Sequence, residues 1–266
     1  MKSIFAAVAL CALVSSCACA KGIDVVSLFD KQTEADMAKL VGATEAHKAA
    51  YFPDGKLQGA VLSFLVNVRG NQVLFDTGLP DGHVAAELRN KGVDPAEVQT
   101  ILLTHMHRDH YGGLVAADGT AAFPNAQVYV SKAERAYWVD QKKNANVISA
   151  LDLYAGRVHE FEAGDEVMPG VTAMDTSGHT PGHVSFMVEN EGEKLLVIGD
   201  LVHFVRIQLP VPEVCVTYDV DPVKAAAARK RIFDLASENG IPVAGMHIPF
   251  PGTLRLKKAG GGYEAY

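Results

Sequence analysis

One short segment, HMHRDH at residues 105–110, limits what this chain can fold into more than any other feature. An apolar run at residues 101–103 precedes it and is typical of a buried strand, and two glycines follow it. Imidazole nitrogens and carboxylate oxygens are ligands for zinc and similar metals. The alternative, a solvated loop in which histidines gather by chance, is disfavoured because the chain has only 10 His in 266 residues. The segment therefore predicts a metal site where a strand passes into a loop.

The spacing within this segment indicates more than one metal ion. Residues two apart in an extended segment point to the same side, so His105, His107 and Asp109 share a direction and His110 points elsewhere. Four ligands this close together crowd a single small tetrahedral ion. The spacing favours two ions that share the loop, and two ions require further ligands from later in the chain.

Later segments supply side chains of the required kind. His179 and His183 lie in a turn-rich segment that follows a strand-like run, while Asp200 and His247 each end a short apolar run. Strands that end at one edge of a sheet bring such side chains to one place. Each residue alone is more often a core or turn residue than a ligand. Repetition of the pattern at several strand ends favours a shared metal site.

The order of these residues resembles that of the metallo-β-lactamase fold superfamily of hydrolases. The resemblance runs from about residue 61 to the C-terminus and includes the segment FDTG at residues 75–78. It implies an α/β protein with a four-layer αββα sandwich, formed by one domain over residues 21–266. It also implies two divalent metal ions, with zinc expected. The implied ligands are His105, His107 and His179 for one ion, Asp109, His110 and His247 for the other, and Asp200 as the bridge between them.

The chemistry that the resemblance implies is hydrolysis. A hydroxide that bridges the two ions would attack the substrate, while one ion polarises its carbonyl or phosphoryl oxygen. Asp109 would be the catalytic residue, because its second oxygen would orient the hydroxide and pass a proton to the leaving group. Asp76 would accept a hydrogen bond from a ligand histidine, the alternative being a plain turn residue. We expect His183 to support its turn and His203 to line the pocket.

Within the superfamily the chain is most similar to the secreted branch that includes methyl parathion hydrolase, with quorum-quenching acyl-homoserine lactonases more distant. The segments that carry this similarity are GDLVH at residues 199–203, Gln208, YDVDP at 218–222 and HIPFPG at 247–252. We therefore expect a small-molecule substrate with a lactone, ester or organophosphate-like bond. The fold hosts many chemistries, so the substrate itself stays open.

Two alternatives to this hydrolase stay open. One is a metal-binding surface lipoprotein with little turnover, although the complete ligand set favours an enzyme. The other is a β-lactamase-like side activity. True dinuclear β-lactamases do not use a bridging carboxylate at the position of Asp200, so β-lactam cleavage is at most a side activity here.

The first twenty residues are expected to be a signal peptide. Lys2 begins the segment, an apolar stretch follows at residues 4–14, and small residues end it. Cleavage after Ala20 and lipid attachment at Cys17 both fit this pattern. We expect an exported protein, periplasmic or secreted, whose only membrane contact is a lipid anchor on Cys17 if that residue is acylated. Cys215 is then the one cysteine of the folded part, which predicts no intramolecular disulfide.

Local signals place helices at residues 34–50, 83–91 and 222–239. Asp221 followed by Pro222 is a strong start signal for the last of these helices. Ser131 and Glu134 have the spacing of a capping box, in which each side chain satisfies the other's backbone N–H. Strands alternate with these helices, which agrees with an αββα sandwich.

The composition is that of an acidic globular protein. Hydrophobic residues make up 48% of the chain and the formal net charge is −7. An acidic chain without a basic stripe predicts that nucleic acid is not its partner. The sequence leaves open whether the protein is a homodimer.

Overall fold

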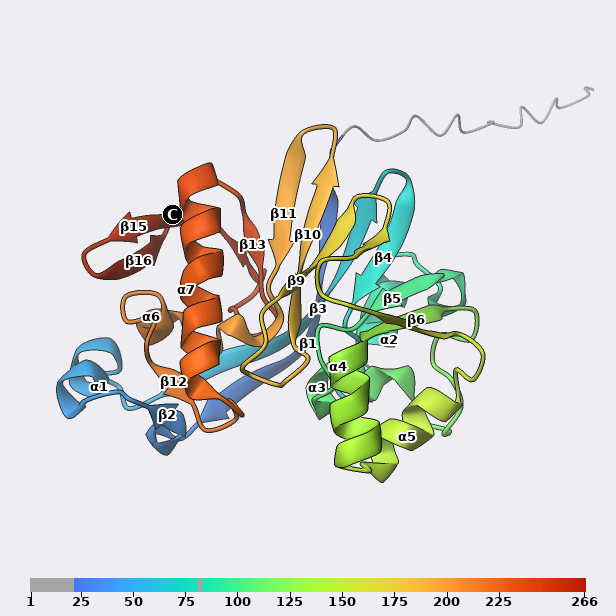
Figure 1. Ribbon diagram of the computed structural model, residues 1–266, viewed down its shortest axis with the longest axis horizontal. Coiled ribbons are helices and arrows are strands. Elements are labelled where there is room, and N and C mark those ends of the chain that lie inside the picture. Colours follow the sequence, from blue (N-terminus) through green and yellow to red (C-terminus); the bar gives the residue numbers. More distant parts are fainter. Residues whose placement is uncertain (1–21, 81–82) are drawn as a thin grey trace, which may run out of the picture.

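A computed structural model describes residues 22–80 and 83–266. The expected signal peptide, Cys17 included, lies outside these residues. The described chain contains two six-stranded sheets with helices outside them (Figure 1). This arrangement confirms the αββα sandwich expected from the sequence. In the described part of the chain, no helix combines the length and apolar character needed to cross a bilayer.

The first sheet joins antiparallel and parallel strands. In spatial order its strands are β1 (Asp24–Ala35), β3 (Leu57–Val68), β4 (Asn71–Phe75), β5 (Thr100–Leu102), β6 (Gln127–Ser131) and β7 (Val158–Phe161). Strands β3 and β4 form a hairpin, with Val68 paired to Asn71. The two turn residues, Arg69 and Gly70, both have positive φ, of 50° and 80°. Two such residues form the turn that matches the twist of a hairpin.

The second sheet supplies the other inner layer. Its strands, in spatial order, are β14 (Thr253–Leu254), β13 (Val243–Ala244), β11 (Glu193–Val197), β10 (Val184–Asn190), β9 (Val171–Asp175) and β8 (Glu166–Met168). Two small sheets pair β2 (Leu40–Val41) with β12 (Cys215–Val216) and β15 (Leu256–Ala259) with β16 (Gly262–Ala265). Strands β9, β11 and β13 run in the same direction, so their carboxyl ends lie at one edge of the sheet.

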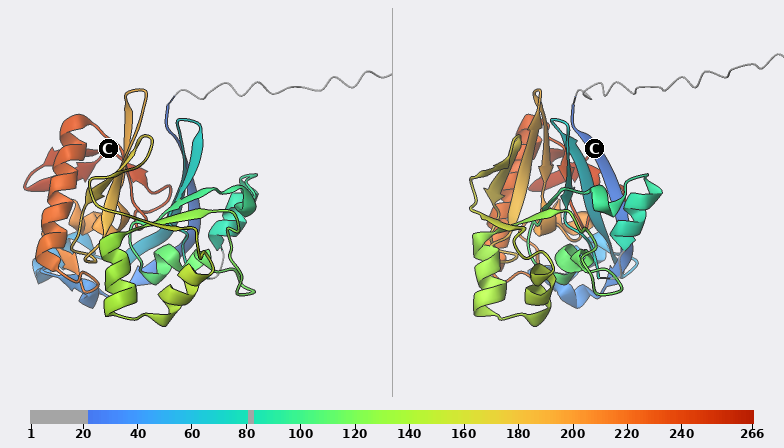
Figure 2. Two further views of the ribbon diagram at one scale, coloured as in Figure 1. Left: turned by 45° about the vertical axis from the view of Figure 1, so that its right-hand side comes forward. Right: turned by 90° about the vertical axis from the view of Figure 1, so that its right-hand side faces the viewer.

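The two large sheets face each other across an apolar core that includes Phe64, Phe75 and Phe186. A second core lies between the first sheet and the helices α2 (His83–Asn90), α3 (Arg108–Tyr111) and α5 (Ala145–Asp152). A third lies under α7 (Pro222–Asn239), which covers the outer face of the second sheet (Figure 2). Burial of apolar area on both faces of each sheet is the main stabilisation of such a layered fold.

The long helix α7 has the predicted bounds. The Asp221 side chain accepts a hydrogen bond from Lys224 N, and Gly240 ends the helix in the left-handed region at φ 63°. The remaining helical segments are short: α1 (Glu45–Tyr51), α4 (Lys132–Arg135), α6 (Val205–Gln208), η1 (Met37–Lys39), η2 (Pro95–Glu97), η3 (Gly112–Leu114), η4 (Ala136–Gln141) and η5 (Gly199–Leu201).

The predicted helix at residues 34–50 is wrong over most of its length. Strand β1 continues to Ala35 because it stays paired with β3, as far as the contact between Ala35 and Leu57. The 3₁₀ turn η1 and strand β2 follow, and α1 begins only after its N-cap, Thr44. Pairing between strands distant in sequence outweighs the local helical preference here.

The predicted capping box is only half formed. Ser131 Oγ accepts a hydrogen bond from Glu134 N at 3.1 Å, as expected. The Glu134 carboxylate accepts hydrogen bonds elsewhere, and α4 passes directly into the π-helical segment η4. Cys215 is buried and is the free cysteine of the described residues.

Candidate metal centre

Ends of strands from both sheets bring the predicted ligands together. His105 and His107 follow β5, and Asp109 and His110 lie in the first turn of α3. His179, Asp200 and His247 follow β9, β11 and β13, whose carboxyl ends share one edge. Side chains from four separate segments thus converge between the two sheets.

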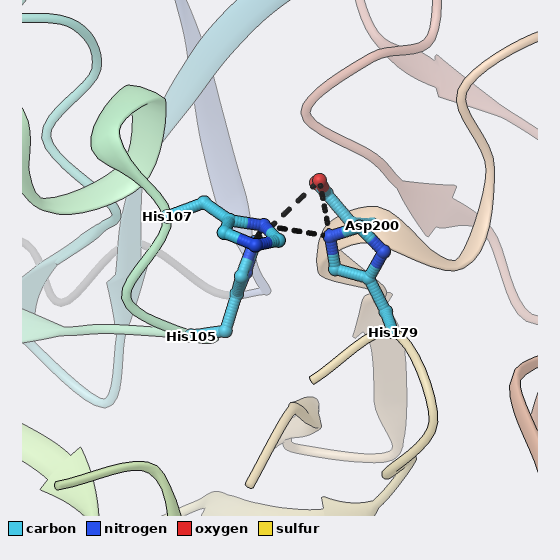
Figure 3. A group of neighbouring side chains, drawn as sticks. All are labelled: His105, His107, His179 and Asp200. Carbon is cyan, nitrogen blue, oxygen red and sulfur yellow. Dashed lines mark hydrogen bonds and ion pairs between the residues drawn. The ribbon is translucent and has the colours of Figure 1, made fainter. Parts of the chain in front are cut away.

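Three imidazoles and one carboxylate form the first cluster, which we call site A: His105, His107, His179 and Asp200. His107 Nδ1 lies 2.9 Å from His105 Nε2 and 2.9 Å from His179 Nε2. Asp200 Oδ2 lies 3.2 Å from His179 Nε2 and 3.6 Å from His105 Nε2. Figure 3 shows these side chains pointing toward one another.

The second cluster, site B, consists of Asp109, His110 and His247, and it also adjoins Asp200. Asp109 Oδ2 lies 3.5 Å from His247 Nε2, and Asp109 Oδ1 lies 3.8 Å from His110 Nε2. Asp200 Oδ1 lies 3.1 Å from His110 Nε2, and Asp200 Oδ2 lies 3.1 Å from His247 Nε2. The Asp200 carboxylate therefore contacts ligands of both sites.

Hydrogen bonds behind the imidazoles fix which nitrogen faces the centre. His110 Nδ1 donates to Asp76 Oδ2 at 2.7 Å, and His179 Nδ1 donates to Asp219 Oδ1 at 2.8 Å. His247 Nδ1 donates to Ala60 O at 2.6 Å. In each ring the remaining nitrogen, Nε2, faces Asp200. Donation by the outer nitrogen orients a metal-binding histidine and raises its basicity.

The charges in the cluster are strongly coupled. Burial raises the pKa of the Asp200 carboxyl, but the imidazoles of His110 and His247 outweigh it and hold the net pKa well below its ordinary value. Burial lowers the pKa of His179, but hydrogen bonds to two carboxylates raise the net value to about 9. Burial also lowers the pKa of His107, to about 3. Protons on some of these nitrogens compete with a divalent cation for the same lone pairs, so metal binding should release protons.

The donor set fits two divalent metal ions. Ligands about 2.0–2.1 Å from a tetrahedral zinc ion are separated by roughly 3.3 Å. The separations of 2.9 to 3.6 Å in site A lie around that value. In addition, the buried atoms His110 Nε2 and Asp200 Oδ1 have no hydrogen-bond partner among the described residues apart from their ion-pair contact with each other at 3.1 Å. Buried polar atoms without a partner are costly, and a bound cation would satisfy both.

Asp76 and His183 lie behind the ligands. Asp76 has φ 57°, in the left-handed region, and its carboxylate also accepts hydrogen bonds from Thr104 N at 2.8 Å and Thr104 Oγ1 at 2.7 Å. His183 Nε2 accepts a hydrogen bond from Asp200 N at 3.0 Å, and its Nδ1 donates to Thr176 Oγ1 at 2.8 Å. His183 thus connects the Asp200 turn to Thr176.

A cavity of about 360 Å³ opens beside both sites. His203 lies on its wall, with Nε2 3.1 Å from Asp200 Oδ2 and its ring stacked on His247 at 4.9 Å between ring centroids. Phe204 and Tyr218 add apolar surface, and Arg108 adds a positive charge. A small cavity with apolar walls and a few polar groups is typical of a small-molecule site.

Two residues of the centre had no clear signal in the sequence. Asp219 orients His179 from 40 positions further along the chain. Glu134 is buried and accepts hydrogen bonds from the loops that carry His107 and His179. Neither residue has a fixed spacing from the ligand that it supports, so only their positions in space reveal these contacts.

Known proteins with similar sequences include hydrolases. The family model described as the metallo-beta-lactamase superfamily matches residues 57–239. An N-acyl homoserine lactonase of a Bacillus species is 28% identical over 173 residues, which are 55% of this chain and 66% of the relative. The N-acyl homoserine lactonase AttM of Azorhizobium caulinodans is 28% identical over 210 residues, or 69% of this chain and 70% of the relative. The match to the Bacillus lactonase thus spans just under two thirds of that protein's length.

Solved structures share the same fold. Hydrolase AbOPH, described as a member of the beta lactamase superfamily, aligns with a TM-score of 0.81 and 30% identity over 91% of this chain and 93% of its own. AidC, described as a dizinc quorum-quenching lactonase, aligns with a TM-score of 0.83 and 21% identity over 92% of this chain and 94% of its own. The identity to AidC is low enough that this second likeness concerns the fold alone.

Proposed function

The chain belongs to the metallo-beta-lactamase superfamily, and on that premise we propose that residues 21–266 form one exported hydrolase domain. The domain holds two divalent metal ions and cleaves a small molecule at a lactone, ester or organophosphate-like bond. The ions are expected to be zinc, held at sites A and B. Lactones are the first class to test, because curated relatives are N-acyl homoserine lactonases. Similarity to the branch that includes methyl parathion hydrolase stays a prediction.

The observation that carries the proposal is the place of Asp200. Asp200 is 2% exposed, and its carboxylate contacts imidazoles of both clusters, so the two clusters can share one anion. A carboxylate with two oxygens is suited to hold two cations a short distance apart. Because sites A and B share one carboxylate, a dinuclear metal centre is favoured over two unrelated polar clusters.

Different residues of the chain then have separate roles in hydrolysis. When bound, the ions would supply Lewis acidity at the substrate oxygen and make an attacking water more acidic. The Asp109 side chain is 28% exposed and faces the cavity, so it can exchange a proton with the leaving group and with solvent. Phe204 and Tyr218 would contact apolar parts of the substrate and exclude water.

The purified protein is expected to carry close to two metal ions per chain after expression with added zinc. Seven predicted ligand side chains lie in two clusters, and three of their imidazoles are oriented by hydrogen bonds from behind, which supports that stoichiometry. Elemental analysis of the mature protein provides the measurement. One ion or none per chain would contradict the dinuclear proposal.

A substrate panel separates the hydrolase from its alternatives. The zinc-loaded protein, the same protein stripped by a chelator, and the stripped protein reloaded with zinc would each be assayed on a lactone, an aryl ester, a phosphotriester and a β-lactam. We expect turnover of at least one of the first three, lost on stripping and restored by zinc. Turnover of none of them would favour the metal-binding surface lipoprotein, and turnover of the β-lactam alone would favour a β-lactamase.

Export is tested at Cys17. We expect the mature chain outside the cytoplasm, either cleaved after Ala20 or lipid-anchored at Cys17. Radiolabelled palmitate on the wild type but not on the Cys17→Ala variant would identify a lipoprotein, whereas label on neither would favour cleavage after Ala20. A full-length cytoplasmic product would be incompatible with both routes.

A further inference from the structure

Glu134, on the short helix α4, is a buried carboxylate that no part of the proposed chemistry uses. It is 0% exposed. Its Oε1 accepts hydrogen bonds from Met106 N at 2.9 Å and Trp138 Nε1 at 2.6 Å. Its Oε2 accepts hydrogen bonds from Thr180 Oγ1 at 2.7 Å and Gly182 N at 3.0 Å. Four donors converge on one side chain.

Three of these donors belong to the two loops that carry the imidazoles of site A, and the fourth, Trp138, lies in η4. Met106 lies between His105 and His107, and Thr180 directly follows His179. A second hydrogen bond holds the loop after His179 against the start of α4, because Ser131 Oγ donates to Gly182 O at 2.6 Å. Gly182 permits this approach, since an added Cβ would lie 2.1 Å from Glu134 N. One carboxylate thus fixes the distance between the two loops.

Site B has a different carboxylate behind it. Asp76 contacts His110 at 2.7 Å and reaches Thr104, which precedes the ligand loop. Asp76 is thus the carboxylate that contacts a ligand of site B directly, and it touches site A only indirectly, through Thr104 next to His105. Among the described residues, the Glu134 carboxylate accepts hydrogen bonds only from the loops of site A and the nearby Trp138.

We propose that Glu134 is a positioning residue that preorganises site A for its metal ion and leaves the affinity of site B largely unchanged. The inference rests on the proposed dinuclear site. If Glu134 holds the loops of His107 and His179 at their binding separation, the metal ion does not have to bring them together. Preorganisation of this kind raises the affinity for the metal ion. The ligands are already ordered in the metal-free protein, so ordering them does not reduce the free energy of metal binding.

A carboxylate is the group that these donors require. A carboxylate only accepts hydrogen bonds, whereas the amide of glutamine places an NH₂ group against two donors. Glu134→Gln therefore keeps the shape of the side chain and loses at least one of its four hydrogen bonds, because a backbone N–H lies on each side of the carboxylate and cannot accept from an NH₂ group. A buried donor left without a partner disfavours the present loop arrangement.

The protein contains a built-in reporter for this site. Trp138 is the single tryptophan of the chain, its indole N–H donates to Glu134, and its ring lies 5.5 Å from that of His107 between centroids. A cation at His107 changes the electrostatic surroundings of this indole. We therefore expect Trp138 fluorescence to change when zinc fills site A and to change little when it fills site B.

The test is a zinc titration of the chelator-stripped protein, followed by calorimetry and by Trp138 fluorescence, with a competing chelator to measure affinity. Glu134→Gln should weaken the fluorescence-linked binding step by about 10–100-fold, the range for losing a group that supports a metal ligand, and leave the other step within about threefold. Asp76→Asn is the reciprocal control, because asparagine tolerates the positive φ at that position. Asp76→Asn should weaken the other binding step more than the fluorescence-linked one, because Asp76 contacts His110 directly and His105 only through Thr104.

The outcomes decide between a positioning role and a general structural one. If the wild type binds two ions, the inference is overturned when Glu134→Gln weakens both binding steps equally. It is also overturned when Glu134→Gln leaves the zinc affinity of both steps unchanged. A wild type that binds no zinc would instead overturn the proposed function. If Glu134→Gln does not fold by circular dichroism, Thr180→Val decides, because it removes one hydrogen bond to Glu134 at nearly constant volume. Thr180→Val should weaken only the fluorescence-linked step, and equal effects on both steps would reject the proposal.

Discussion

Replacing Asp200 with alanine is expected to lower hydrolysis by about 10³-fold or more and to release at least one of the two metal ions. The Asp200 carboxylate is buried and contacts imidazoles of both clusters, so its removal would take away the anion that the two proposed ions would share. Removal of a single stabilising group from an active site already costs about 10²–10³-fold, and here ligation is lost as well. Metal analysis and rates on the best substrate of the panel, both at fixed zinc concentration, measure the effect.

The matched control for this variant is Asp152→Ala. Asp152 is an exposed carboxylate at the end of α5 and lies outside both clusters. We expect this control to keep both ions and the wild-type rate. If Asp200→Ala also kept two ions and the wild-type rate, Asp200 would have no place in the centre.

Changing Asp109 to asparagine is expected to lower turnover by roughly 10²–10⁴-fold while retaining more metal than Asp109→Ala does. Asp109 lies 3.5 Å from His247 Nε2 and reaches the cavity. The amide of asparagine keeps one oxygen for coordination but neither accepts nor delivers a proton at neutral pH. Turnover numbers and metal content of both variants, measured side by side, provide the check.

The choice of substrate separates proton transfer from ligation at Asp109. Proton delivery matters most when the leaving group is poor, so Asp109→Asn should slow an alkyl ester more than an aryl ester with a good leaving group. Equal losses on both esters would mean that Asp109 acts only as a ligand. The catalytic role proposed for it would then be wrong.

Much of this protein could be predicted from local sequence. Metal coordination accepts few side-chain types, so the cluster at residues 105–110 stands out without any structure, and His179, Asp200 and His247 follow from their places at strand ends. Helix α7 could be predicted to its exact bounds because its start and stop signals, Asp221 with Pro222 and Gly240, act within a few residues of the chain. Helix start and stop signals act between residues that are close in the sequence, so they can be recognised without a structure.

Other features depend on segments that meet only after folding. Residues 34–35 lie in the predicted helix at 34–50, yet they extend β1 because β3 offers pairing partners 22–24 positions away. Glu134 and Asp219 hold site A across separations of 28 and 40 residues or more, and no spacing rule links a buried carboxylate to such distant donors. The amino-acid sequence by itself determined which side chains can bind metal and where the ends of strands deliver them. Only the tertiary structure decided how they are oriented, because hydrogen-bond geometry depends on distances in space and not on positions along the chain.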